Sequence, residues 1–210
     1  MKRLVTVGGL GVGIIALCVQ LFLTISSRLV NGDNLLDAFI FFISFFTILT
    51  NLALVLIYAS ALFKGRWLDG LRRDGVRAMM AGIMTLVMIF YHFMLAQTWN
   101  PQGWFKVCDI ALHYVTPVIY LVWWVWGQPH GALRFRDIPA MFIPAAIYVA
   151  YVMIRGAITT IYPYAVFDAH TLGYEAVAIN LVGLIVFTGI LFAVAVLADK
   201  VLSRSSPQMH

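Results

Sequence analysis

The chain has 210 residues, of which 62% are hydrophobic and only 11% charged, and its mean hydropathy is +0.92. Soluble domains are about half apolar and about a quarter charged, so this composition excludes an ordinary soluble domain and indicates a membrane protein. The net charge of +5 does not indicate nucleic-acid binding, because the basic residues lie in short segments between apolar runs and form no patch interleaved with aromatic residues.

Six apolar stretches are long enough to cross a bilayer as helices, at residues 4–25, 36–63, 78–97, 107–126, 138–154 and 174–197. A spanning helix needs about 20 apolar residues, and a helix satisfies its own backbone hydrogen bonds in lipid. The first stretch is too long for a cleaved signal peptide. In the fifth, Pro144 should kink or restart the helix. We therefore predict an all-α, polytopic membrane protein with one domain, residues 1–210.

The segments between these stretches differ in charge. Eleven of the 14 Lys and Arg residues lie on the side that holds both termini: Lys2, Arg3, Lys64, Arg66, Arg72, Arg73, Arg77, Arg134, Arg136, Lys200 and Arg204. The other side and its helix ends hold Arg28, Lys106 and Arg155. Because cytoplasmic loops are enriched in Lys and Arg, we predict cytoplasmic N- and C-termini, in the cytoplasmic membrane if the source is prokaryotic.

Polar residues inside the predicted helices gather at one depth. Counting residues along each helix at about 1.5 Å per residue puts five of them in the outer half and Thr47 near the middle; the five are His92, Asp109, His113, Arg155 and Asn180. Ionisable groups in a membrane are costly and often mark a functional site. Spacings of three and four residues place two further sets on single helix faces: Ser44, Thr47, Thr50 and Asn51; and Tyr148, Tyr151 and Arg155. This pattern predicts a shared polar cavity that opens outward.

Each polar residue also has a purely structural interpretation. Ser44 can bond its own i−4 carbonyl, Asn51 and Asn180 can bridge helices, Arg155 can extend to the headgroups, and Asp109 can sit as a charge at a helix start. His92 can be an interhelical histidine. His113 differs from these, because Asp109 one turn earlier can orient its ring.

Threonine and histidine together indicate a specific chemistry. A threonine hydroxyl becomes a useful nucleophile when a neighbouring base removes its proton, and histidine is the usual base near neutral pH. Thr47 and His113 can form this pair, and Asp109 can hold the imidazole. Arg155, Asn180 or tyrosine hydroxyls can bind the developing oxyanion.

Several short segments resemble those of one protein family. They are FFTILTNL at 45–52, Asn100-Pro101, DIALHYVTP at 109–117 and IYPY at 161–164. They resemble, in matching order and over roughly residues 35–200, the androgen-induced integral membrane proteins, which include the androgen-dependent regulator of tissue factor pathway inhibitor. That family comprises multi-span hydrolases of fatty acid esters of hydroxy fatty acids.

The resemblance implies specific roles for residues of this chain. It places the nucleophile on Thr47 and its partner on His113, with Thr50, one helical turn away, as the alternative nucleophile. Two departures are visible, since Asp109 stands where the family has Asn, and Arg155 falls near a family His. We expect supporting roles for Asp109, Thr50, Asn51, His92, Arg155 and Asn180, and a substrate pocket lined by Tyr148, Tyr151 and Tyr162.

The expected function is therefore hydrolysis of a lipid ester within the membrane, without a cofactor or a metal, with membrane lipids and the ester as partners. Cys18 and Cys108 match no metal-binding spacing. Two other classes stay open. One is a protein that binds or transports a solute or lipid without chemistry. The other is an electron carrier whose haem is ligated by His92 and His113.

Overall fold

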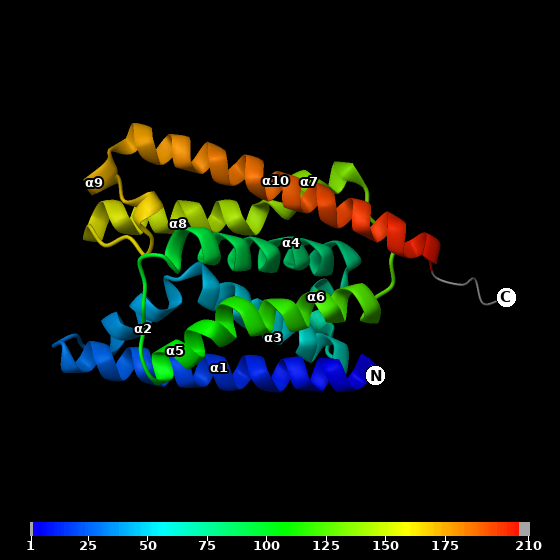
Figure 1. Ribbon diagram of the computed structural model, residues 1–210, viewed down its shortest axis with the longest axis horizontal. Coiled ribbons are helices and arrows are strands. Elements are labelled where there is room, and N and C mark those ends of the chain that lie inside the picture. The colour runs from blue at the N-terminus through cyan, green and yellow to red at the C-terminus, as the bar shows by residue number, and fades with distance from the viewer. Residues whose placement is uncertain (1, 206–210) are drawn as a thin grey trace.

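The computed structural model describes residues 2–205, and this part of the chain is all-helical, with its long helices running along one common axis (Figure 1). Five helical segments are long and apolar enough to cross a membrane, and the count is six if the bent pair of α2 and α3 forms one span. The α-helices are α1 (Lys2–Val30), α2 (Leu35–Ile43), α3 (Phe46–Leu62), α4 (Asp74–Phe90), α5 (Trp104–Ile110), α6 (Thr116–Gly127), α7 (Ile138–Met141), α8 (Ile143–Thr159), α9 (Ala169–Leu172) and α10 (Tyr174–Ser205). The predicted multi-span helical membrane fold is confirmed.

The second predicted helix is not continuous. The expectation of one helix over residues 36–63 is wrong, because α2 and α3 are bent by 76° at a break between Ile43 and Phe46. Phe45 is extended, with φ −84° and ψ 128°. The hydroxyl of Ser44 donates to the carbonyl of Ile40 at 2.6 Å. Bonds of this kind compete with the regular helix and often bend it. Hydropathy does not detect such a break, since both halves are apolar.

The fifth span restarts at its prolines, as expected. The short α7 ends at Met141, and α8 begins at Ile143 with Pro144 in its first turn. Proline is well tolerated there because the first amides of a helix have no intrahelical partner. The α8 helix then continues to Thr159, beyond the predicted end.

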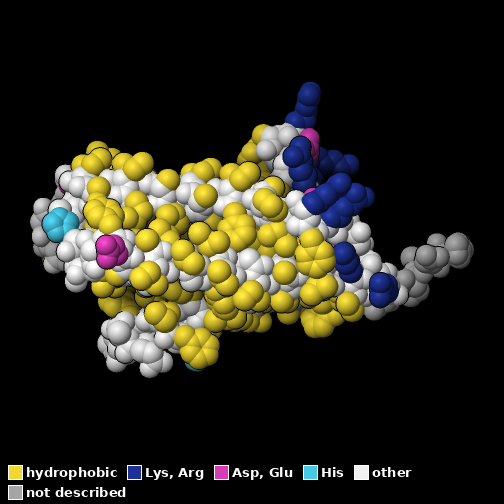
Figure 2. All heavy atoms as spheres, turned by 90° about the horizontal axis from the view of Figure 1, so that it is seen from above, with side chains coloured by type: hydrophobic (Ala, Val, Ile, Leu, Met, Phe, Trp, Pro, Cys, Tyr) yellow, Lys and Arg dark blue, Asp and Glu magenta, His cyan; other side chains and the backbone are white. Residues whose placement is uncertain are grey.

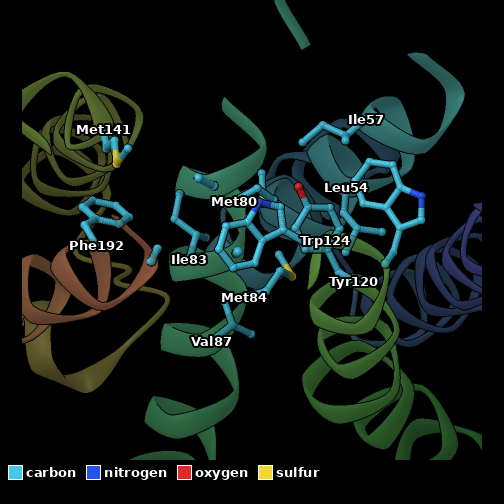
Figure 3. Packing of buried hydrophobic residues seen from close by; sticks show 14 of the residues in the cluster. Leu54, Ile57, Met80, Ile83, Met84, Val87, Tyr120, Trp124, Met141 and Phe192 are labelled. Atoms are coloured by element: carbon cyan, nitrogen blue, oxygen red, sulfur yellow. The ribbon is translucent and has the colours of Figure 1, made fainter. Parts of the chain in front are cut away.

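The tightly packed core occupies one half of the bundle. It is formed by the second half of α3, by α4 from Ala78 to Val87 and by the second halves of α6 and α10, with Leu133 and Met141 added. Figure 3 shows Leu54, Met84, Tyr120 and Phe192 from these four helices. Helix α4 lies between α6 and α10. Helix α8 approaches α4 and α10 much less closely. The bundle is therefore dense toward one end and looser toward the other.

The dense end carries most of the basic residues. Figure 2 shows the Lys and Arg side chains gathered at one end of the molecule, beside the long apolar surface of the helices. The beginning of α1 and the last described turn of α10 lie at this same end (Figure 1). A buried hydrogen bond joins the segment before α7 to α10 there, with 3.2 Å between His130 Nδ1 and Asp199 Oδ1.

Helices α1 and α3 pack closely because α1 carries glycines on the shared face. A Cβ at Gly9 would lie 2.6 Å from the Tyr58 ring, and one at Gly13 would lie 2.7 Å from a methyl group of Val55. Small residues at such positions let two membrane helices approach each other. The same helix offers a contrast at Gly11, where an added Cβ would meet nothing within 4 Å.

These glycines give a test of the α1–α3 contact. Gly13→Ala should destabilise the protein by about 1–3 kcal/mol, because the new methyl group overpacks against the stiff Val55 side chain. Gly11→Ala, the matched control, should be neutral or slightly stabilising because alanine favours helix. Thermal unfolding of the two variants in detergent measures the difference. Equal stability of both variants would contradict this packing.

Candidate active site

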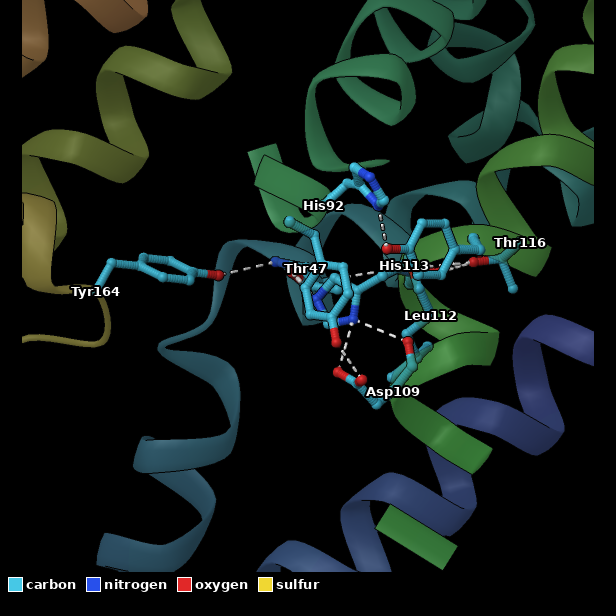
Figure 4. A network of polar contacts seen from close by, with 10 residues as sticks. Thr47, His92, Asp109, Leu112, His113, Thr116 and Tyr164 are labelled. Atoms are coloured by element: carbon cyan, nitrogen blue, oxygen red, sulfur yellow. Dashed lines mark hydrogen bonds and ion pairs between the residues drawn. The ribbon is translucent and has the colours of Figure 1, made fainter. Parts of the chain in front are cut away.

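The helix break places Thr47 beside His113. Thr47 lies in the first turn of α3, and its Oγ1 is 3.2 Å from His113 Nε2 (Figure 4). The Thr47 side chain is buried, and the His113 side chain is 15% exposed. The two residues are 66 positions apart in the chain. The structure therefore brings together the two residues that were expected to carry the chemistry.

The other ring nitrogen of His113 is held by Asp109. His113 Nδ1 lies 2.9 Å from the Asp109 carbonyl oxygen and 3.2 Å from its carboxylate Oδ1. Since both partners are acceptors, Nδ1 carries the proton, and Nε2 of the neutral ring is left to accept from the Thr47 hydroxyl. This tautomer is the one that a general base needs. The other carboxylate oxygen of Asp109 accepts from the Tyr91 hydroxyl.

Two π-helical turns shape this region. One continues α4 over Tyr91–Leu95, and the other joins α5 to α6 over Ala111–Val115. Such turns occur frequently at functional sites. The first contains Tyr91, whose ring stacks on His113 with 3.8 Å between centroids. The second contains His113 itself. The two turns thus present the histidine and the aromatic ring that covers it.

Asn51 ties α3 to the second π-helical turn. Its side-chain amide donates to the Thr47 carbonyl at 2.8 Å and to the Leu112 carbonyl at 3.1 Å. Its carbonyl oxygen accepts from the Thr116 hydroxyl. Asn51 is fully buried, and a buried amide with these partners fixes two helices in register. Asn51 therefore supports the separation between Thr47 and His113, as a bridge rather than as a reacting group.

Thr50 is engaged elsewhere. Its hydroxyl donates toward the carbonyls of Phe46 at 2.9 Å and Thr47 at 3.1 Å, both within α3. Thr47, by contrast, has its hydroxyl beside the imidazole. This geometry favours Thr47 over Thr50 as the nucleophile.

A large cavity opens at the Thr47–His113 pair. Its volume is about 570 Å³, which is typical of a site for a small ligand. Nearly all of its surface is apolar, contributed by side chains of α4, α8 and α10 that include Leu86, Val87, Ala146, Val149, Leu184 and Ile185. Thr47, His113 and Tyr148 also line it. Ile185 lines the cavity and is 57% exposed on α10, so the cavity reaches the outer surface of the bundle.

Two tyrosines were not expected near the nucleophile. Tyr91 lies one position before His92, which was expected to support the site. Tyr164 lies two positions after Tyr162, which was expected to line the pocket. The Tyr164 hydroxyl is 3.5 Å from the Thr47 amide nitrogen, and both tyrosines line the cavity. Tyrosine is neutral, so a search for ionisable residues inside apolar stretches does not select it. The available signal was the second tyrosine of the Tyr-Pro-Tyr segment.

Five expected site residues neither line the cavity nor hydrogen-bond to Thr47 or His113. Arg155 donates to the Ile161 carbonyl at 2.9 Å, and Asn180 donates to the Val166 carbonyl at 3.0 Å. Both therefore brace the connection between α8 and α10, and the expectation that they assist at the oxyanion has no support in these contacts. The other three are His92, Tyr151 and Tyr162.

Those three residues have structural partners of their own. His92 is exposed and its Nδ1 is 3.0 Å from the Tyr114 hydroxyl. Tyr151 shares a hydrogen bond with the Ser44 hydroxyl at 3.1 Å. Tyr162 packs on α8 where Gly156 leaves room. Of the three tyrosines expected in the pocket, Tyr148 alone lines the cavity.

The haem alternative depends on the surroundings of His113 and His92. Among residues 2–205, no group of three or more His, Cys, Asp and Glu side chains is arranged to hold a metal ion. His113 uses both ring nitrogens, for Thr47 and for Asp109, and Tyr91 covers its face. These contacts leave His113 poorly placed to pair with His92 as a haem ligand.

No protein-family model, no curated protein and no solved structure matches this chain. Its function is therefore inferred from the site itself.

Proposed function

We propose that the protein is a membrane-embedded hydrolase of lipid esters that uses Thr47 as nucleophile and His113 as general base. The observation that carries this proposal is the 3.2 Å contact between Thr47 Oγ1 and His113 Nε2, with Nδ1 held by Asp109. Nucleophile, base and orienting group stand in line, which is the arrangement that recurs in hydrolases of unrelated fold. The apolar cavity at the nucleophile accommodates an acyl chain.

The reaction follows from this geometry. Thr47 Oγ1 attacks the ester carbonyl carbon while its proton passes to His113 Nε2. The tetrahedral intermediate collapses as His113 returns that proton to the departing alcohol oxygen, leaving the acyl group on Thr47. His113 then removes a proton from water, whose oxygen attacks the carbonyl carbon of the acyl-threonine. When this second intermediate collapses, the bond to Thr47 Oγ1 breaks, His113 returns the proton to that oxygen, and the carboxylic acid is released. Asp109 keeps the ring oriented and stabilises the imidazolium that forms in each half.

The substrate class rests on the apolar cavity and on the resemblance to the androgen-induced family. An acyl chain buried between α4, α8 and α10 contacts apolar side chains almost throughout, and the reactive ester then lies at Thr47. Fatty acid esters of hydroxy fatty acids, or similar acyl esters, fit this description.

A fluorophosphonate probe with a long alkyl chain tests the nucleophile. Thr47→Val should abolish labelling, because it removes the hydroxyl and keeps the shape. Thr50→Val is the matched control, because its hydroxyl is bonded within α3, and it should label like the unmodified protein. We expect at least a roughly 1,000-fold loss of ester turnover in Thr47→Val. Peptide mapping of the labelled protein identifies the site.

Labelling that persists in Thr47→Val would contradict this assignment. A lipid-binding protein without chemistry is the second candidate, favoured by the apolar lining of the cavity. It would bind a long-chain fatty acid equally well in Thr47→Val and in the unmodified protein, and neither would label or hydrolyse ester.

We also propose that the basic end faces the cytoplasm, with both termini on that side and the active site in the outer half of the bilayer. The support is the segregation of Lys and Arg to one end. A C-terminal fusion to green fluorescent protein should fluoresce, and the same fusion to alkaline phosphatase should be inactive in a bacterial host. An active phosphatase fusion would reverse the orientation.

A further inference from the structure

The start of α3 has backbone amides that the helix itself does not satisfy. The cap residue Phe45 provides no side-chain hydrogen bond. Its carbonyl accepts from Ile48 and Leu49, at 3.1 and 3.2 Å, so the amides of Phe46 and Thr47 precede the first intrahelical bonds. Amides inside a membrane need acceptors from elsewhere in the protein. These two point out of the helix start, where partial positive charge accumulates.

Tyrosine hydroxyls meet these amides. The Thr47 amide donates to the Tyr164 hydroxyl at 3.5 Å, which is a long and weak bond. The Phe46 amide interacts with the hydroxyls of Tyr148 and Tyr164. The Tyr148 hydroxyl donates its own proton to the Ser44 carbonyl at 2.9 Å. The Tyr164 hydroxyl also contacts the hydroxyls of Thr47 and Tyr148, and a hydroxyl hydrogen rotates to suit its partner, so its proton can turn toward an acceptor that enters the cavity.

The Tyr164 ring is held firmly in place. It packs edge-on against Phe45 and Phe167, with 5.9 and 6.2 Å between ring centroids. Figure 4 shows its hydroxyl directed at the backbone of Thr47 from the side opposite His113. Burial raises the pKa of Tyr164, so the phenol stays neutral and keeps its proton for donation. A carbonyl carbon at Thr47 Oγ1 would have its oxygen near both the Tyr164 hydroxyl and the Thr47 amide.

We propose that Tyr164 is a catalytic residue, whose hydroxyl and the Thr47 amide together donate hydrogen bonds to the oxyanion of the tetrahedral intermediate. As the carbonyl π electrons move onto oxygen during attack by Thr47, the negative charge forms between these two donors. It returns to a carbonyl when the alcohol departs, and no proton is transferred to or from Tyr164. This inference rests on the proposed hydrolase function.

The expected effect is specific to the transition state. Removing one oxyanion donor costs about 100- to 1,000-fold in kcat in hydrolases. Tyr164→Phe should therefore lower kcat by about this factor on a fluorogenic long-chain acyl ester, with KM changed less than about threefold. Tyr162→Phe is the matched control, because Tyr162 packs on Gly156 outside the cavity wall. It should keep kcat and KM.

A second measurement separates a catalytic role from a structural one. A long-chain alkyl trifluoromethyl ketone forms a tetrahedral oxyanion when Thr47 adds to it. Its inhibition constant should weaken at least about 100-fold in Tyr164→Phe, while binding of a long-chain alcohol in the cavity and the thermal unfolding midpoint stay near those of the unmodified protein. Loss of binding of both molecules together with a lower midpoint would assign Tyr164 a structural role and overturn the proposal.

Two further outcomes separate the role of Tyr164 from the hydrolase function. If the unmodified protein hydrolyses ester and Tyr164→Phe does so with unchanged kcat, the role of Tyr164 is refuted and the hydrolase function stands. If the unmodified protein neither hydrolyses the ester nor reacts with the fluorophosphonate, the hydrolase function is refuted, and the role of Tyr164 with it.

Discussion

The constraint on which the site depends is the need to satisfy backbone polar groups at a helix break inside the membrane. A break in lipid exposes carbonyls at the end of one helix and amides at the start of the next, and each unsatisfied group is costly there. Here the Tyr148 hydroxyl donates to the Ser44 carbonyl, and the Tyr164 hydroxyl accepts a hydrogen bond from the Thr47 amide. Both tyrosines come from α8 and the segment that follows it. The break therefore positions Thr47. The tyrosine hydroxyls that hydrogen-bond to the free backbone groups at the break also lie next to this nucleophile.

The two halves of the bundle serve different purposes. The basic end is close-packed around Tyr58, Met84 and Trp123, and the His130–Asp199 pair joins α10 to the segment before α7. The opposite half contains the broken helix, both π-helical turns and the cavity. Irregular backbone lowers local stability, so it is tolerated where a dense region elsewhere holds the helices together. In this protein, the close-packed end allows α8 to stand away from α4 and leave space for a ligand.

The sequence predicted those features that depend on hydropathy and helical period. Apolar stretches of adequate length located the spans, and the restart at Pro144 followed from proline stereochemistry. The spacing of Asp109 and His113 placed an acid one helical turn from a histidine, and in the structure the Asp109 carboxylate contacts His113 Nδ1. Thr47 was expected beside His113 partly from a family resemblance, and the contact between them is present in the structure.

Other features had no such signal. Depth along a helix can be counted, but rotation about its axis depends on packing, and Arg155 and Asn180 bond to the carbonyls of Ile161 and Val166 instead of facing the site. The 76° break was invisible because apolar residues continue through it. Nothing in the residue pattern distinguished Tyr91 from other membrane tyrosines, and Tyr164 had only its place in the Tyr-Pro-Tyr segment. Their roles depend on contacts between distant segments.

The most direct test of this account is an experimental structure of the protein after reaction with a long-chain alkyl phosphonate. We expect a covalent bond from Thr47 Oγ1 to phosphorus, with the alkyl chain between α4, α8 and α10. The phosphoryl oxygen should lie within hydrogen-bonding distance of the Thr47 amide and the Tyr164 hydroxyl. A structure in which the adduct forms on another residue, or in which Thr47 stays unmodified and separated from His113, would contradict it.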